Sequence, residues 1–258
     1  MISSISDIHI KKSGDDRSKL LLNFLKHEKV VNSKYIFLLG DIFDLMIGNH
    51  HEYLFEFSEI FEEIVKLCNR GKRVYYFEGN HDFLLSEFFN YFSSKNQLGS
   101  NFFYSPTDIQ LTINGREFYC CHGDNIEIDN PKYKIYKKLI NNNFTHYLSN
   151  NIVPYQVIQM IGHYASARSR KKNQQKYNLM SEKDLEYIKK KFRDSADIVK
   201  TLAPEVDFII SGHSHVEDIY RSKNGYIYLN NGHLPNTKKF IYLDEKLKPS
   251  FVKLSPSP

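Results

Sequence analysis

The sequence of 258 residues predicts an α/β fold built on a parallel β-sheet. Strand-like apolar runs and helical patterns alternate three times within the first hundred residues. The run at residues 35–39 is short, continuous and apolar, as in a buried parallel strand. Asp41 follows that run, and open α/β sheets place their sites at the carboxyl ends of their strands. Asp41 is therefore a candidate site residue, although a helix-capping carboxylate would have the same surroundings.

The first half of the chain contains six elements that local patterns predict. A helix at 15–28 follows from an apolar stripe at Leu20, Leu21, Phe24 and Leu25. A second helix ends before Gly71, a residue that favours helix termination. The expected order is a strand at 2–6, a helix at 15–28, strands at 35–39 and 73–77 around a helix at 52–69, and a helix at about 83–92.

The second half of the chain no longer alternates strand and helix patterns in the same way. Residues 109–113 alternate between apolar and polar, and Asn114-Gly115 predicts a hairpin turn into a strand at 117–121. Residues 131–200 have a helical pattern, and we expect them to form a helical lid. The core would then comprise residues 1–130 and 201–258, with further strands at 206–210, 218–221, 226–230, 239–243 and near 251.

Charge and cysteine content limit the classes of partner and compartment. Residues 131–200 carry 15 Lys or Arg and 5 Asp or Glu, a net charge of +10, whereas the rest of the chain carries −5. Such a basic segment favours an anionic partner such as phosphate, nucleic acid or a membrane surface, although a solvated lysine-rich face would show the same excess. Three cysteines, two of them adjacent, argue against a disulfide framework and favour a reducing cytoplasm. No apolar run approaches the roughly 20 residues of a membrane span, and we expect no signal peptide.

Seven potential metal ligands follow five of the predicted strands. They are Asp7, His9, Asp41, Asn80, His122, His213 and His215. A mixture of imidazole, carboxylate and amide oxygen suits Mn, Fe or Zn better than Mg or Ca, and the absence of thiolates disfavours a structural zinc site. Two metals that share a carboxylate can position water for attack on phosphorus, and Asp41 is the natural shared ligand. Each residue alone would more often be a satisfied polar side chain.

These residues form five ordered motifs: Asp-x-His, Gly-Asp-x-x-Asp, Gly-Asn-His-Asp, His-Gly-Asp and Gly-His-x-His. In this order they resemble the calcineurin-like metallophosphoesterase superfamily. The resemblance implies a four-layer α/β/β/α sandwich, here with a helical cap insertion. It also implies that Asp7, His9, Asp41 and His215 hold one metal ion and that Asp41, Asn80, His122 and His213 hold the other. His81 would protonate the leaving oxygen or stabilise charge, with Asp82 orienting it.

Within that superfamily the chain resembles the UDP-2,3-diacylglucosamine pyrophosphohydrolases of lipid A biosynthesis. The stretch 40–48, the stretch 80–84 and the spacing of polar residues after His122 carry this resemblance. It implies substrate contacts from Asn80, His81, Asn130, Tyr133, Ser169, Asn173, Lys176 and His213. Four departures from that family's pattern are His81 for Arg, Met46 for Trp, Asp44 for Glu, and Val216-Glu217 for Arg-Pro.

The expected activity is cleavage of the pyrophosphate bond of UDP-2,3-diacylglucosamine to 2,3-diacylglucosamine 1-phosphate and UMP, with two divalent metal ions, Mn before Fe or Zn. The expected location is cytoplasmic and peripheral, on the anionic cytoplasmic face of the inner membrane. The alternatives are a related phosphoesterase acting on another nucleotide, phosphodiester or phosphoprotein, and a non-catalytic scaffold that keeps the fold. A nuclease is conceivable on the charge of +10 but ranks lower, and no nucleic-acid partner is expected.

Overall fold

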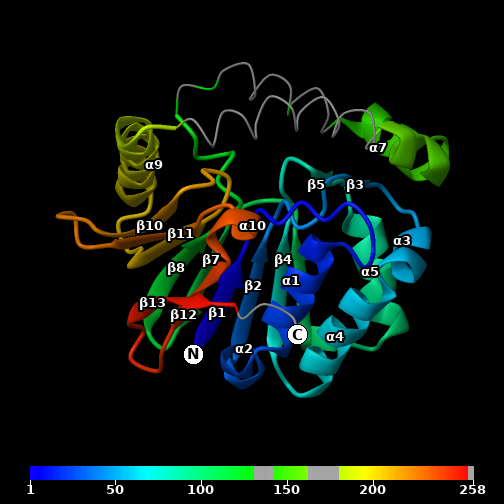
Figure 1. Cartoon of the computed structure of the whole chain (residues 1–258), viewed down its shortest axis with the longest axis horizontal. Helices are drawn as coiled ribbons and strands as arrows, with labels where there is room; N and C mark the ends of the chain where they lie inside the picture. The colour runs from blue at the N-terminus through cyan, green and yellow to red at the C-terminus, as the bar shows by residue number, and fades with distance from the viewer. Residues whose placement is uncertain (129, 131–136, 138–141, 162–179, 255–258) are drawn as a thin grey trace.

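The computed structural model describes residues 1–128, 130, 137, 142–161 and 180–254. Two β-sheets pack face to face, and helices cover the outer face of each sheet (Figure 1). One hydrophobic cluster lies between the sheets, and one lies beneath each helical layer. The expected four-layer α/β/β/α arrangement is therefore confirmed.

The first sheet has six strands, and its centre is parallel. Its order is β13 (Pro249–Lys253), β12 (Lys239–Leu243), β1 (Ile2–Ile5), β2 (Tyr35–Leu39), β4 (Arg73–Phe77) and β6 (Phe102–Ser105). β1, β2, β4 and β6 run parallel, β12 is antiparallel to β1, and β13 is antiparallel to β12. All five residues of β2 are buried, because helices cover one face and the second sheet covers the other.

The second sheet has five strands in the order β10 (Glu217–Arg221), β11 (Ile227–Asn231), β9 (Phe208–Ser211), β8 (Arg116–Cys120) and β7 (Ile109–Ile113). The predicted hairpin joins β7 to β8. Asn114 and Gly115 have positive φ values of 52° and 72°, as the tight turn requires. A separate pair, β3 (Met46–Ile47) and β5 (Asp82–Phe83), lies beyond the ends of β2 and β4.

The helices on the first sheet are α1 (Asp16–Lys26), α2 (Glu28–Asn32), α3 (Glu52–Glu56), α4 (Ser58–Asn69) and α5 (Ser86–Lys95). The Asp15 side chain caps α1 by accepting from the backbone of Ser18. The single helix expected at 52–69 is divided at Phe57, which leaves the helical conformation and packs its ring 4.6 Å from that of Phe43. The helix expected from residue 83 starts at Ser86, because Phe83 pairs with β3.

The outer layer on the second sheet is α9 (Glu182–Leu202), which begins with a capping box of Ser181 and Asp184. Its buried face packs on Ile209 and on two tyrosines of the second sheet. α9 falls inside the range 131–200 that the sequence predicts as a lid, yet it forms a layer of the core. The remaining short helices are η1 (Gly99–Asn101) and α10 (Leu234–Thr237). No helix among the described residues combines the length and hydrophobicity that crossing a bilayer requires.

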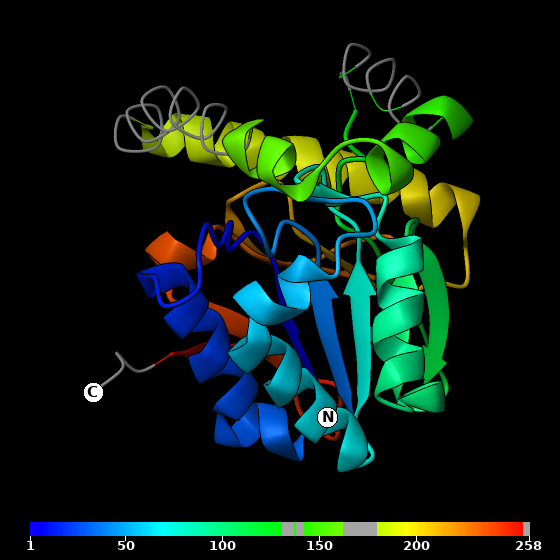
Figure 2. The same cartoon turned by 90° about the vertical axis from the view of Figure 1, so that its right-hand side faces the viewer.

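α7 (Asn143–Asn151) and the helical residues 155–161 lie over the loops at the carboxyl end of the first sheet (Figure 2). Gly48 allows this approach, because a Cβ there would lie 2.6 Å from the carbonyl oxygen of Ser149. Tyr155 and Gln159 both donate to the carboxylate of Glu56 in α3. These described residues of the expected lid therefore rest on the segment that follows β3.

Candidate metal centre

Left-handed backbone turns follow the strands that end at the predicted ligands. Five non-glycine residues there have φ between 52° and 65°: Asp7, His9, Asp41, His213 and His215. A non-glycine residue in this region costs of order 1–3 kcal/mol, and such strain gathers at functional sites. Arg17 stabilises the first turn by donating to the carbonyl oxygens of Ile8 and His9, at 3.1 and 3.0 Å. The strained turns bring side chains from β1, β2 and β9 to one place.

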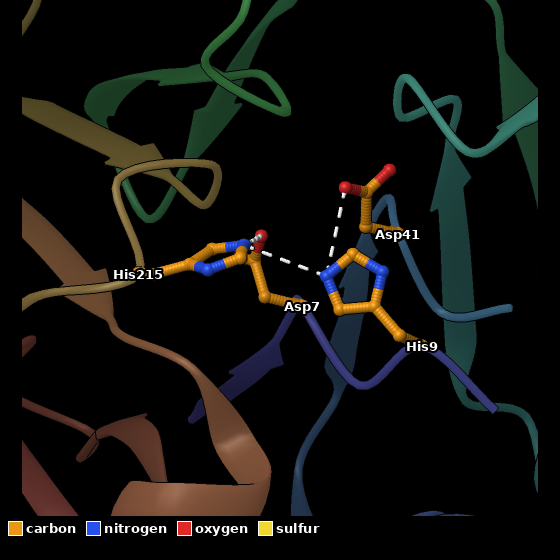
Figure 3. A group of neighbouring side chains, drawn as sticks. All are labelled: Asp7, His9, Asp41 and His215. Atoms are coloured by element: carbon orange, nitrogen blue, oxygen red, sulfur yellow. Dashed lines mark hydrogen bonds and ion pairs between the residues drawn. The ribbon is translucent and has the colours of Figure 1, made fainter. Parts of the chain in front are cut away.

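The first predicted ligand group converges (Figure 3). Asp7, His9, Asp41 and His215 each offer a ligand atom within 4.8 Å of the others. The Nε2 atom of His215 lies 3.1 Å from Oδ1 of Asp7 and 3.4 Å from Nε2 of His9. The His9 Nε2 atom is 3.8 Å from Oδ2 of Asp41. Two carboxylates and two imidazoles therefore face a common point.

The second predicted group adjoins the first through Asp41. The Nε2 atom of His122 is 3.5 Å from Oδ2 of Asp41 and 3.1 Å from Oδ1 of Asn80. The ring of His213 lies 5.1 Å from that of His122, between centroids. Its backbone N–H donates to Asp7 at 3.0 Å. Asp41 therefore touches members of both groups, as a shared ligand must.

The residues present fit a pair of divalent cations. Asp7 and Asp41 are 0% and 1% exposed, and carboxylates buried so deeply need positive charge close by. Gly79 and Gly212 leave room for them, because a Cβ would lie 2.2 Å from Oδ1 of Asp41 and 2.6 Å from Oδ2 of Asp7, respectively. Oxygen and imidazole nitrogen together suit Mn, Fe or Zn.

The surrounding imidazoles keep both carboxylates ionised. Burial alone would raise the pKa of Asp41, but His122 and His81 outweigh it and hold that pKa well below its usual value. Burial likewise opposes ionisation of Asp7, and the adjacent His215 lowers the pKa of that carboxyl nonetheless. Both groups therefore offer anionic oxygens at neutral pH.

His81 lies beside the first ligand group, with its ring 4.7 Å from that of His9. Its backbone N–H donates to Oδ1 of Asp41, and its Nδ1 atom lies 2.8 Å from the carbonyl oxygen of Asp44. Burial would lower the pKa of His81, but the Asp41 carboxylate raises it above the ordinary value. This shift favours the protonated form of His81, which is the form that an acid requires.

Asp82 is completely buried and accepts hydrogen bonds from the backbone. Its Oδ1 atom accepts from the N–H groups of Asp41 and Gly79, and its Oδ2 atom accepts from Ile42, each at 2.8 Å. The hydroxyl of Tyr76 also donates to it, at 2.5 Å. The family resemblance implies that Asp82 orients His81, but the hydrogen bond of the His81 ring is to the carbonyl oxygen of Asp44. Asp82 instead ties the two ligand-bearing loops together.

Among the predicted substrate-binding residues, Asn130 donates to Glu127 at 2.8 Å. Tyr133, Ser169, Asn173 and Lys176 lie outside the described residues. Sequence reasoning missed Glu127, whose Oε2 atom lies 3.3 Å from Nε2 of His213. Only its place between the His-Gly-Asp motif and Asn130 hinted at a role.

His233 also borders the centre, with its ring 5.1 Å from that of His215. Burial lowers its pKa to about 4, so this imidazole is neutral at physiological pH. It adds a polar neighbour to the first ligand group without adding charge.

Comparisons with known proteins identify a family and named relatives of this chain. The family model described as calcineurin-like phosphoesterase matches residues 2–217. A protein of Wigglesworthia glossinidia brevipalpis named UDP-2,3-diacylglucosamine hydrolase is 24% identical over 97% of this chain and 93% of its own length. A Pasteurella multocida protein of the same name is 23% identical over 96% of each chain. Among solved structures, an archaeal phosphodiesterase matches with a TM-score of 0.48 and 12% identity, over 97% of this chain and 98% of its own.

Proposed function

Because the chain belongs to the calcineurin-like phosphoesterase family of metal-dependent hydrolases, we propose that it cleaves the pyrophosphate bond of UDP-2,3-diacylglucosamine. The products would be 2,3-diacylglucosamine 1-phosphate and UMP, a step in lipid A biosynthesis. The observation that carries this proposal is the convergence of Asp7, His9, Asp41 and His215 on one point. The similarity to the named hydrolases along almost the whole chain supports the choice of substrate.

In this proposal the two ligand groups hold two divalent cations, Mn before Fe or Zn, at the positions described above. When bound, such cations supply positive charge to the phosphate oxygens and lower the pKa of water. Asp7 and Asp41 remain ionised and carry no proton into the reaction. Asn80 and His213 contribute to the second group and border the phosphate.

His81 is the proposed proton donor. The carbonyl oxygen of Asp44 accepts from Nδ1, so Nε2 is the atom that can give a proton to the leaving oxygen. Its raised pKa keeps that proton in place before the reaction. Asp82 has no direct part in this transfer. Its carboxylate holds the Asp41 loop and the Gly79 loop together by accepting a backbone hydrogen bond from each.

The nucleotide and sugar would contact Asn130, Tyr133, Ser169, Asn173 and Lys176, in the segment 130–176. We also propose a peripheral position on the anionic cytoplasmic face of the inner membrane. Exposed apolar side chains on the described lid helices support this, among them Phe144, Ile152 and Met160, which are 69%, 56% and 65% exposed. Together with the basic charge of residues 131–200, such a surface suits an anionic bilayer.

The direct test is release of UMP from UDP-2,3-diacylglucosamine by the purified protein with Mn²⁺, with Asp41→Asn as the inactive control. UMP formation that depends on Asp41 supports the proposal. Turnover of bis(p-nitrophenyl) phosphate without any UMP release would refute the proposed substrate, while the proposed phosphoester hydrolysis would still hold. His81 favours that second candidate, a phosphodiesterase with another substrate, because the pyrophosphohydrolases carry Arg at this position.

Flotation with vesicles tests the membrane position separately. The protein should float with vesicles of phosphatidylglycerol and phosphatidylethanolamine, and a Phe144→Ser/Ile152→Ser variant should float less. Absence of flotation at low ionic strength would remove the peripheral membrane part of the proposal.

A further inference from the structure

We infer that Glu127 is a positioning residue for the second metal site, because its carboxylate holds the ring of His213 so that Nδ1 is the nitrogen presented to the cation. The inference rests on the proposed assignment of His213 to that site. It goes beyond the seven ligands, because Glu127 belongs to none of the motifs that identify them.

The contact itself is direct and enclosed. Oε2 of Glu127 lies 3.3 Å from Nε2 of His213, and the two side chains are 13% and 19% exposed. A neutral imidazole that donates from Nε2 carries its lone pair on Nδ1. Histidine ligands commonly donate their other ring N–H to a carboxylate, which fixes both the tautomer and the ring orientation. Glu127 stands where such a carboxylate is needed.

Glu127 is itself held firmly in place. Its backbone N–H donates to the carbonyl oxygen of Gly123, and the N–H of Ile128 donates to the hydroxyl of Ser195 in α9. The other carboxylate oxygen, Oε1, accepts from Nζ of Lys191 at 2.6 Å. The carboxylate therefore cannot swing away from His213 without breaking contacts to the outer helical layer.

The His213 ring is also restrained on its remaining sides. It packs against the ring of Phe192 in α9 and against that of His122, with centroids 6.2 and 5.1 Å away. Its backbone N–H donates a hydrogen bond to the carboxylate of Asp7. With the backbone and the ring faces fixed in this way, the hydrogen bond at Nε2 selects which nitrogen serves as ligand.

The same carboxylate joins the metal site to the proposed substrate segment. Oε2 accepts from the side-chain amide of Asn130 at 2.8 Å as well as facing His213. Oε1 of the same group accepts from Lys191. One carboxylate is thus shared by a proposed metal ligand, a predicted substrate contact and α9.

Titration of the metal-free protein with Zn²⁺ against a competing chelator tests this inference. Calorimetry should give two sites in the wild type. Glu127→Ala should weaken one of them about 10- to 100-fold and leave the other unchanged, since loss of such an outer partner typically has this effect. Glu127→Gln keeps an acceptor oxygen and should lose less. Glu63→Gln is the matched control, because Glu63 is 16% exposed, accepts from Lys66 at 2.8 Å and lies in α4, away from the centre.

A second readout concerns the tautomer and does not depend on activity. Long-range ¹H–¹⁵N correlation spectra of the Zn²⁺-loaded wild type should show His213 protonated at Nε2 and coordinated through Nδ1. Coordination through Nε2 would overturn the inference.

The variant His213→Ala separates the inference from the assignment beneath it. If His213→Ala abolishes one site and Glu127→Ala leaves both affinities unchanged, the role of Glu127 is refuted and the proposed function stands. If His213→Ala retains both sites, the assignment of His213 fails and the inference fails with it. Rescue of Glu127→Ala turnover by excess Mn²⁺ supports positioning, because added metal would not repair a misfolded core.

Discussion

Replacing Asp82 by Asn tests whether this residue holds the ligand loops or assists catalysis directly. The carboxylate accepts four hydrogen bonds of 2.5–2.8 Å, three from backbone N–H groups and one from Tyr76. An amide has a single acceptor oxygen, so part of this set must be lost. If the oxygen stays at the Oδ1 position, Asp41 and Gly79 keep their acceptor.

The new NH₂ group then faces the N–H of Ile42, the hydroxyl of Tyr76 and the more distant N–H of Phe43, which lies 3.4 Å from Oδ2 of Asp82. The hydroxyl can rotate and accept, whereas the backbone N–H of Ile42 cannot. One buried donor left without an acceptor costs roughly 1–3 kcal/mol. For a chain of this size each kcal/mol lowers Tm by about 2–4 °C, so we expect a fall of roughly 2–12 °C.

Differential scanning calorimetry with and without Mn²⁺ would measure this change, with kcat determined in parallel. Tyr76→Phe is the companion variant, because it removes one donor to the same carboxylate and leaves the Ile42 N–H its acceptor. Tyr76→Phe should therefore lower Tm by less than Asp82→Asn does. An unchanged Tm for Asp82→Asn combined with a greatly reduced kcat would refute the loop-holding role and restore direct assistance to His81.

Three further variants probe the centre and its surroundings. Gly79→Ala should abolish metal binding and turnover, because its Cβ would lie 2.2 Å from the Asp41 carboxylate, and equilibrium dialysis measures this. Gly71→Ala is the control: its φ of +76° makes the change destabilising, but a Cβ there meets open space, so the variant should still bind metal. Asp41→Asn should lower kcat roughly a thousandfold or more, since several kcal/mol of charge stabilisation depend on the cations, while circular dichroism stays unchanged; wild-type turnover would contradict the shared-ligand role. Burial raises the pKa of Glu78 to about 7, so the folded state binds this proton more tightly, and the contribution of Glu78 to stability should be greatest below pH 4.5 and decline as pH rises to 7. Glu78→Gln, which keeps an acceptor for Tyr104, should flatten that decline in thermal melts, and parallel pH profiles for the two proteins would disprove the cause.

Local patterns in the sequence predicted those elements whose residues carry their own signal. β2 was predicted with its observed bounds, because an uninterrupted apolar run between two polar segments has few other uses. The hairpin at Asn114 and Gly115 was likewise predicted from neighbouring residues alone. The ligand Asp41 followed from β2, because a parallel strand delivers the residue after it to the edge where the neighbouring strands also end.

Elements that depend on distant partners could not be predicted in the same way. β6 is four residues long and is a strand because it pairs with β4. The break at Phe57 between α3 and α4 accompanies its packing on Phe43, which lies in another loop. Both features are set by tertiary contacts that local periodicity does not contain.

The same distinction applies within the site. Asp82 is adjacent to His81 in sequence, yet its side chain bonds to the loop after β2, about 40 residues earlier. Glu127 acquires its place from Lys191, which is 64 residues away. Motif spacing predicted the group of Asp7, His9, Asp41 and His215, which lie together. The contacts that hold these residues depend on tertiary packing, which motif spacing does not contain.

The central claim is that the seven predicted ligands hold two cations around Asp41. A crystal structure of the protein soaked in Mn²⁺, with data collected at the manganese absorption edge, tests it most directly. We expect two anomalous peaks about 3.5–4 Å apart, both within coordinating distance of Asp41. A single peak, or two peaks of which one does not touch Asp41, would contradict the claim.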